Sequence, residues 1–242
     1  MCARSFRLEF FWKGIGMKLL STIAVTAMVA ASAFATTGAK ASDQTALLAN
    51  ARATVEDMKS DSTFGPSRDL LRRARAVLII PKLVKGGFII GGEGGDGVLL
   101  AHNKGGWSSP AFYTMGSASF GFQIGLEQAQ LVLFIMSDKA LRGVESSEFK
   151  LGAGAGLTVV TVGASAEGAT SGNLSGDIIV WTSAKGAYGG LTLNGSVIKP
   201  REGWNNDFYG RTVTVNEILA NRVKNPASAD LHAALTGARR RH

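Results

Sequence analysis

Six basic side chains lie within eighteen residues, and this run is the clearest candidate for binding chemistry in the sequence. One acidic residue, Asp69, lies among them. The six are Arg68, Arg72, Arg73, Arg75, Lys82 and Lys85. Each cation near an anionic surface contributes roughly 1 kcal/mol of attraction, so such a cluster is suited to phosphate head groups. A solvated helix face followed by a basic turn is the competing interpretation, and composition leaves both open.

A glycine-rich segment, residues 92–97, matches the G-x-G-x-x-G spacing of dinucleotide-binding loops. Such a loop must be followed by a helix, because the pyrophosphate binds at the helix N-terminus. Here the strand-like sequence GVLLAH follows. We therefore expect a glycine-rich hairpin rather than a nucleotide site.

The sequence contains few candidate catalytic or metal-binding residues and no recognised catalytic motif. The histidines are His102, His232 and His242, and none has metal-ligand spacing to Cys, Asp or Glu. Neither a G-x-S-x-G nor an H-E-x-x-H motif occurs. The carboxylates that flank the expected strands form no obvious pair and are interpreted as a solvated rim: Glu127, Asp138, Glu145 and Glu148. We expect no catalytic residues, no metal site, no cofactor and no enzymatic activity.

An export signal is indicated between Met17 and Ala41. Lys18 precedes a run of apolar and small residues without charge, 19–35, and the small-residue pattern of a cleavage site ends at Ala41. We expect cleavage there, with a second possible site after Ala35; an uncleaved membrane anchor is the alternative. Residues 1–16 are either an extended positive start or precede the true start at Met17. The expected location is the periplasm, the cell envelope or the medium.

The expected organisation is a signal peptide over residues 1–41, a single domain over 42–236 and a basic tail over 237–242. The sole cysteine, Cys2, lies in the first segment, so the domain is expected to have no disulfide. Four of the eight net positive charges also belong to that segment. The remaining excess is small for a nucleic-acid-binding protein and compatible with an anionic membrane surface.

Periodicity predicts which elements position these residues. Residues 42–61 have the apolar spacing of an amphipathic helix that begins at Ser42 as N-cap, and residues 67–75 form a short basic helix. Lys82 and Lys85 are placed in a turn over residues 81–87. Short apolar runs bounded by glycine, proline or asparagine then predict strands. These runs are 76–80, 87–90, 97–102, 119–125, 131–136, 156–163, 177–183 and 191–198.

Three local signals add detail. Residues 102–106 have the composition of a hairpin turn, and residues 137–142 indicate a short helix between strands. Thr214 and Glu217 form a capping box that begins one or two C-terminal helices. The predicted fold class is α+β and β-rich: a twisted, barrel-like antiparallel sheet with helices at both ends of the domain.

The β region resembles the SYLF domain family, a lipid-binding group that includes eukaryotic actin-patch regulators and many exported bacterial proteins. The resemblance covers about residues 43–210, and its strongest part is residues 71–125. The motifs that carry it are KGGF at 85–88, GGDGV at 94–98, WSSP at 107–110, GFQIG at 121–125, GAYGGL at 186–191, LNGS at 193–196 and FYG at 208–210.

This resemblance implies binding of lipids with phosphorylated head groups and no catalysis. Family members are implied to contact membranes through an N-terminal amphipathic segment and nearby basic residues, here the helix after Ser42 and the Arg72–Lys85 group. The helix after Ser42 is not basic, which argues against its direct insertion. We expect Arg72, Arg73, Arg75, Lys82 and Lys85 to contact an anionic phospholipid.

The apolar half of such a site is expected at Trp107, Phe112 and Tyr113, since aromatic side chains with polar groups suit an interface. Core packing is the alternative for all three. A structural or protein-binding role in the envelope, with an envelope protein as partner, is the alternative function. No nucleic-acid partner is expected, and the sequence does not define an oligomeric state.

Overall fold

The computed structural model describes residues 36–62, 64–65, 67–87, 90–120, 125–152, 156–161, 176–183, 193 and 195–237. The chain divides into two compact units, residues 1–42 and residues 43–242, and the fold given below is that of the second. Several predictions concern residues outside the described ranges. These are the apolar core of the signal peptide, the end of the basic tail and the motifs at 121–124 and 186–191.

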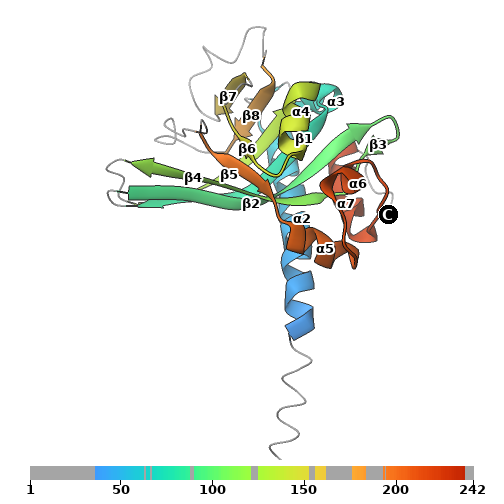
Figure 1. Ribbon diagram of the computed structural model, residues 1–242. Coiled ribbons are helices and arrows are strands. Elements are labelled where there is room, and N and C mark those ends of the chain that lie inside the picture. The colour runs from blue at the N-terminus through green and yellow to red at the C-terminus, as the bar shows by residue number, and fades with distance from the viewer. Residues whose placement is uncertain are drawn as a thin grey trace, which may run out of the picture. The chain divides into compact units, whose positions relative to one another are not determined.

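A curled, mainly antiparallel sheet that forms a half-barrel is the centre of the fold (Figure 1). Its strand order is β6-β9-β4-β2-β1-β5-β8-β7, with β3 paired to β2, and among the described strands only β7 and β8 run parallel. The strands are β1 (Ala76–Gly87), β2 (Ile90–Asn103), β3 (Gly106–Trp107), β4 (Ala111–Phe120), β5 (Gly125–Ile135), β6 (Phe149–Lys150), β7 (Leu157–Thr161), β8 (Ile178–Thr182) and β9 (Val197–Pro200). The predicted fold class is confirmed.

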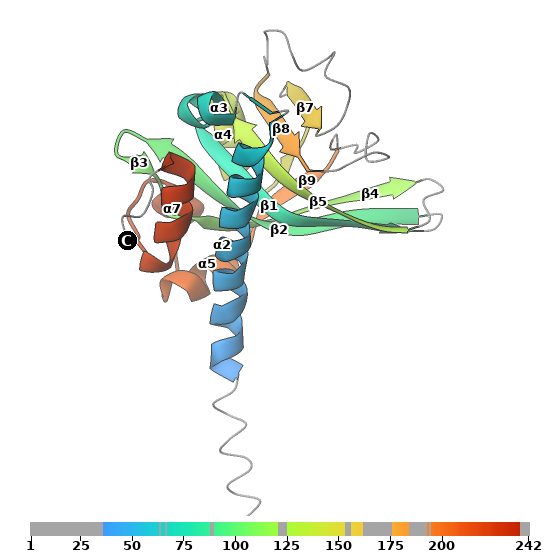
Figure 2. The same cartoon turned by 180° about the vertical axis from the view of Figure 1, so that it is seen from behind.

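Helices cover both faces of this sheet. They are α2 (Thr36–Ser60), α3 (Ser67–Arg73), α4 (Asp138–Glu145), α5 (Glu202–Tyr209), α6 (Val215–Leu219), the short 3₁₀ helix η2 (Pro226–Ser228) and α7 (Ala229–Thr236). Alternate side chains along each strand enter two separate cores, as the period of two requires. One core packs against α2, α3, α5 and α7, and the other against α4 and α6. Figure 2 shows α2 crossing the sheet with α7 beside it.

The first helix begins earlier than expected. It starts at Thr36, so Ser42 is an internal residue of α2 and not its N-cap. The apolar stripe itself is confirmed, because Leu48, Ala51, Val55 and Met58 are buried against the sheet. The buried stripe fixes α2 on the domain, which agrees with the argument against its direct insertion into a bilayer.

Residues 81–87 were expected to form a turn, and this expectation is wrong. They continue β1, which has an irregularity in its pairing with both neighbours. The register shifts between Ile79 and Val84 against β2, and between Ile80 and Leu83 against β5. Pro81 lacks an N–H to donate, and a bulge is where a central strand tolerates proline. The bulge replaces the turn that Pro81 suggested.

Glycines of the neighbouring strand make room for this bulge. A Cβ on Gly97 would lie 2.7 Å from the Ile79 carbonyl oxygen, and a Cβ on Gly95 would meet the Lys82 carbonyl oxygen. The segment 92–97 therefore lies inside β2, in an arm of the hairpin and not in its turn. Close approach of the β1 backbone accounts for Gly95 and Gly97, whereas a Cβ on Gly92 or Gly94 would make only an ordinary contact with β4.

Other local predictions are confirmed. His102 pairs with Trp107 across the tight turn between β2 and β3. Ser137 caps α4 by accepting a hydrogen bond from the Ala140 N–H. Thr214 and Glu217 form both bonds of the capping box at the start of α6. Some predicted strands were too short. Of β4, only the C-terminal end was predicted to be strand, within the apolar run 119–125.

Candidate functional site

The short helix α3 presents arginines to solvent because two leucines hold its other side in the core. Leu70 and Leu71 are buried against the α2 side of the sheet. On the outer side, Arg68 is exposed, and the side chains of Arg72 and Arg73 retain 78% and 56% of their exposure. The predicted short basic helix is confirmed, although it ends at Arg73 and leaves Arg75 beyond it.

One carboxylate partly neutralises these arginines. Asp69 accepts a hydrogen bond from Arg72 at 2.9 Å and forms an ion pair with Arg73 at 2.7 Å. The hydrogen bond from Arg72 is the main reason that the pKa of Asp69 lies below its usual value. Asp69 therefore remains ionised and pairs with both guanidinium groups without shielding them from solvent.

A second helix extends this basic surface. Arg75 forms an ion pair with Asp138 at 3.2 Å, at the start of α4. Lys139 and Arg142 are exposed on the same helix. Figures 1 and 2 show α3 and α4 at the same end of the sheet, where they pack on opposite faces. These two cations were not predicted to join the basic cluster, because more than sixty residues separate them from α3 in the sequence.

We call this surface the cationic end. Its members are Arg68, Arg72, Arg73, Arg75, Lys139 and Arg142. Acidic side chains at or beside it are Asp69, Asp138, Glu145 and Asp177. The six cations thus exceed the four carboxylates, which gives the surface a modest positive charge.

Lys82 and Lys85 do not join the cationic end. Arg75 and Lys85 are ten residues apart, most of them in β1, which corresponds to roughly 30 Å in an extended strand. The bulge also separates the two lysines. Leu83 packs in the core on the α4 side, so strand alternation places Lys85 on that side, whereas Lys82 lies beside α2.

The backbone register places an acidic residue opposite Lys85 on each neighbouring strand. The register pairs it with Glu93 of β2 and with Glu127 of β5. Glu93 is buried and accepts a hydrogen bond from Ser117 at 2.9 Å. This environment is suited to internal charge balance and gives Lys85 no prominent role toward an external anion.

Lys82 instead borders a polar cavity of about 380 Å³ between α2, β1 and β5. Its side chain is exposed at the bulge. The lining also contains Thr54 of α2 and Gln128 of β5. The sequence signal for this site was Pro81, which marks the bulge but was interpreted as a turn.

The three candidate aromatic residues are buried. Trp107 is 7% exposed and stacks on His102, while Phe112 and Tyr113 are almost completely enclosed. The Tyr113 hydroxyl donates to the Val144 carbonyl, and burial raises the pKa of this phenol. All three side chains therefore pack in the core, as the alternative interpretation held.

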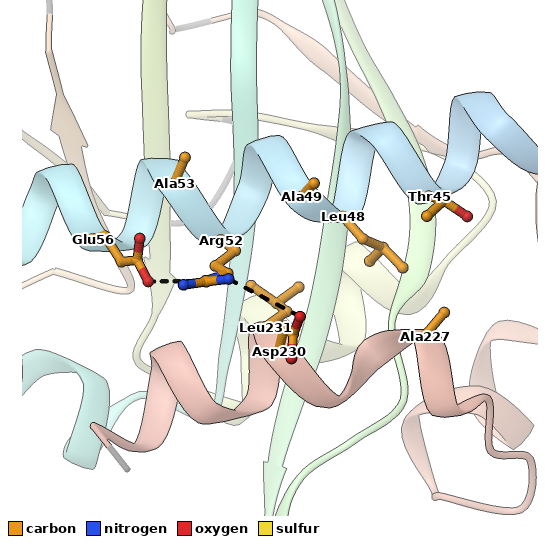
Figure 3. A pocket seen from close by; sticks show the side chains of 9 residues that line it. All are labelled: Thr45, Leu48, Ala49, Arg52, Ala53, Glu56, Ala227, Asp230 and Leu231. Carbon is orange, nitrogen blue, oxygen red and sulfur yellow. Dashed lines mark hydrogen bonds and ion pairs between the residues drawn. The ribbon is translucent and has the colours of Figure 1, made fainter. Parts of the chain in front are cut away.

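A second hollow, of about 390 Å³, lies between α2 and α7 (Figure 3). Arg52 spans it, with an ion pair to Glu56 at 2.9 Å and a longer one to Asp230 at 4.0 Å. Leu48 and Leu231 belong to its apolar part. Its charged groups are already paired with one another, so the hollow contributes more to joining the two helices than to binding.

Within the described residues, no three His, Cys, Asp or Glu side chains are arranged to hold a metal ion. His232 Nε2 lies 2.8 Å from the Ser108 carbonyl oxygen, and His102 stacks on Trp107. Both described histidines thus have structural contacts. No helix in the described part of the chain has both the length and the apolarity to cross a bilayer.

Comparison with known proteins gives the family. The family described as "Ysc84: Las17-binding protein actin regulator" matches residues 116–238, from within β4 to just beyond α7. The chain belongs to the Ysc84 family. The resemblance to the SYLF family is thereby confirmed.

Relatives within the Ysc84 family include longer proteins. Protein YSC84 of Saccharomyces cerevisiae is 34% identical over 72% of this chain and 38% of its own length. LAS seventeen-binding protein 3 of the same species is 31% identical over 72% of this chain and 39% of its own length. SH3 domain-containing YSC84-like protein 1 of Homo sapiens is 26% identical over 66% of this chain and 47% of its own length.

The chain thus spans less than half the length of these Ysc84 relatives. No solved structure matches it significantly. The matched family region begins after α3 and the β1 bulge, so the arginines of α3 and Lys82 lie outside it. Lys139 and Arg142 lie inside it.

Proposed function

We propose that this Ysc84-family chain is a non-enzymatic binding domain that recognises anionic lipid head groups at a membrane surface. The observation that carries the proposal is the cationic end, where α3, the adjoining Arg75 and α4 present six cations beside four carboxylates. Guanidinium groups suit phosphate because their planar donors bind its oxygens in pairs. Exposed arginines are therefore appropriate contacts for a phosphorylated surface.

The proposed location is outside the cytoplasm, in the periplasm, the envelope or the medium. It rests on the apolar run after Lys18 and the small residues that end at Ala41. An anionic bilayer surface would attract a basic patch by roughly 1 kcal/mol per cation. Salt weakens such attraction because the Debye length shortens to about 3 Å at 1 M.

Co-sedimentation with vesicles tests the proposal. The purified chain is mixed with neutral and anionic vesicles at low and at high salt. We expect salt-sensitive binding to anionic vesicles alone. The double variant Arg72→Gln/Arg73→Gln should weaken binding by roughly 2 kcal/mol, or about thirtyfold, because it removes two cations from the surface. Leu70 and Leu71 are unchanged, so α3 should remain packed.

The matched control removes two exposed cations from another element. Arg222 and Lys224 lie between α6 and η2 and are exposed. Arg222→Gln/Lys224→Gln should bind vesicles nearly as well as the unchanged chain. Equal losses in both double variants would show only a response to net charge. Binding that persists in Arg72→Gln/Arg73→Gln would exclude α3 as the contact.

A protein partner is the second candidate, since relatives carry the printed names "LAS seventeen-binding protein 3" and "SH3 domain-containing YSC84-like protein 1". Those names describe the relatives, and for this chain they support a protein partner, which the proposed location would make an envelope protein. A chain that ignores every vesicle but retains a stoichiometric partner from membrane-free extract would favour this function.

A further inference from the structure

The cavity beside the β1 bulge contains a polar atom that lacks a partner. Thr54 lies on the sheet-facing side of α2, is fully buried and lines this cavity. Among the described residues, its Oγ1 is the one buried side-chain polar atom without a hydrogen bond. A buried hydroxyl left unpaired is costly and requires an explanation. A ligand or water that reaches the cavity would supply the missing partner.

Several groups around Thr54 have unused hydrogen-bonding capacity. Within the described part of the chain, the side chains of Asn50, Lys82 and Gln128 take part in no hydrogen bond or ion pair. Each lines the cavity from a different element, namely α2, β1 and β5. Together they offer two amides and one ammonium group to a common space.

The other polar residues that line the cavity, Gln130 and Ser183, already form hydrogen bonds within the protein. Ser183 Oγ accepts a hydrogen bond from the Gln130 backbone N–H at 3.0 Å, and the Gln130 side chain donates to Asp57 at 2.9 Å. Asp57 is the acidic residue that this chain of hydrogen bonds reaches, and it does not line the cavity. Lys82 is therefore the charged residue of the cavity itself.

The bulge holds Lys82 in this position. Its shift in register places Lys82 on the α2 side and Leu83 in the opposite core. Gly95 and Gly97 of β2 leave the space that the displaced β1 backbone occupies. A regular strand would have reversed the side on which Lys82 emerges, because successive side chains alternate between faces.

We propose that this cavity binds a singly charged phosphodiester group, with Lys82 as the counter-ion and Asn50, Thr54 and Gln128 as hydrogen-bonding partners. One cation with neutral donors matches a single negative charge better than a doubly charged phosphomonoester. The volume of about 380 Å³ lies in the range of small-ligand sites. The inference rests on the proposed function, because it assigns the head group that a membrane-bound chain would select.

Isothermal titration of the purified chain with a soluble glycerophosphodiester, glycerophosphoglycerol, tests the cavity without a membrane. We expect saturable binding. Lys82→Gln should weaken it by at least roughly tenfold, the effect of losing a charge-assisted hydrogen bond. Thr54→Val should weaken it by a smaller factor. Glycerol alone should produce no binding heat.

Lys104→Gln is the matched control. Lys104 is exposed in the turn between β2 and β3, toward the other end of the β1–β2 hairpin and roughly 30 Å from Lys82 along the strands. Its variant should bind as the unchanged chain does. Absence of binding to the unchanged chain, or equal binding by Lys82→Gln, would overturn the proposal. A water molecule at Thr54 would account for the second result.

A parallel titration with phosphatidylglycerol vesicles distinguishes a lipid from a soluble source. If Lys82→Gln loses both ligands, the head group of a lipid is the source. If the soluble ligand binds through Lys82 but vesicles do not bind, the cavity is correct and the membrane function is wrong. If vesicles bind and the soluble ligand does not, the cationic end acts alone and the cavity proposal fails.

Discussion

At the residue scale, the unpaired hydroxyl of Thr54 has a consequence for stability. Thr54→Val keeps the shape of the side chain and removes a buried oxygen that has no partner. We expect the free energy of unfolding to rise by about 1 kcal/mol in the unliganded chain. Urea denaturation with an unchanged m-value measures this.

A buried serine with a partner provides the contrast. Ser109 Oγ donates to the Val223 carbonyl at 2.7 Å, so Ser109→Ala should lower the free energy of unfolding by about 1 kcal/mol. If Thr54→Val is destabilising to the same degree, the Thr54 hydroxyl has a partner in solution that stabilises the fold.

Individual side chains differed in how well the sequence could predict them. Arg72 and Arg73 were predictable because Leu70 and Leu71 define the buried side of their helix. The position of Trp107 could not be predicted, because the same apolar ring surface packs equally well in a core and at an interface.

At the element scale, the β1 bulge requires a glycine opposite it. Gly97→Ala would place a Cβ 2.7 Å from the Ile79 carbonyl oxygen, and the backbone there is central in the sheet. We expect a loss of about 1–3 kcal/mol in the free energy of unfolding, as for other overpacked sites. Thermal unfolding measures the loss.

Gly94→Ala is the control for this prediction. Its Cβ would lie 3.6 Å from the Met115 carbonyl oxygen, an ordinary contact, and the position is exposed. We expect a change within about 0.5 kcal/mol, typical of exposed substitutions. Equal losses at both glycines would mean that glycine is needed for the strand and not for the bulge.

Elements with local signals were the predictable ones. The caps at Ser137 and Thr214 depend on neighbours three residues away, so the sequence contains their whole cause. The bulge at Pro81 depends on pairing with β2 and β5. A proline indicates a turn and a bulge equally, and the long-range pairing that distinguishes them is absent from the local pattern. The same limitation assigned Lys82 and Lys85 to one basic patch.

At the scale of the whole molecule, the helix α2 is held by elements from the other end of the chain. Gln44 donates to the Trp204 carbonyl of α5 at 3.1 Å, across 160 positions in sequence. Lys59 donates to the Ala234 carbonyl of α7. Burial lowers the pKa of Lys59, which is consistent with the position of its side chain between α2 and α7. No local pattern predicts these contacts, although the apolar stripe of α2 predicts that some partner exists.

A double-mutant cycle tests whether α2 and α7 stabilise one another. Leu48 and Leu231 are 3% and 1% exposed, line the same hollow and belong to one core (Figure 3). Leu48→Ala and Leu231→Ala should each lower the free energy of unfolding by about 2–4 kcal/mol. The loss in the double variant should be smaller than the sum of the two single losses by at least about 0.5 kcal/mol.

The control pair uses Ile218, which is equally buried but lies in the core on the opposite face of the sheet. Leu48→Ala combined with Ile218→Ala should therefore be additive within about 0.5 kcal/mol. Additivity in both pairs would mean that α2 and α7 are stabilised independently, each by the sheet alone.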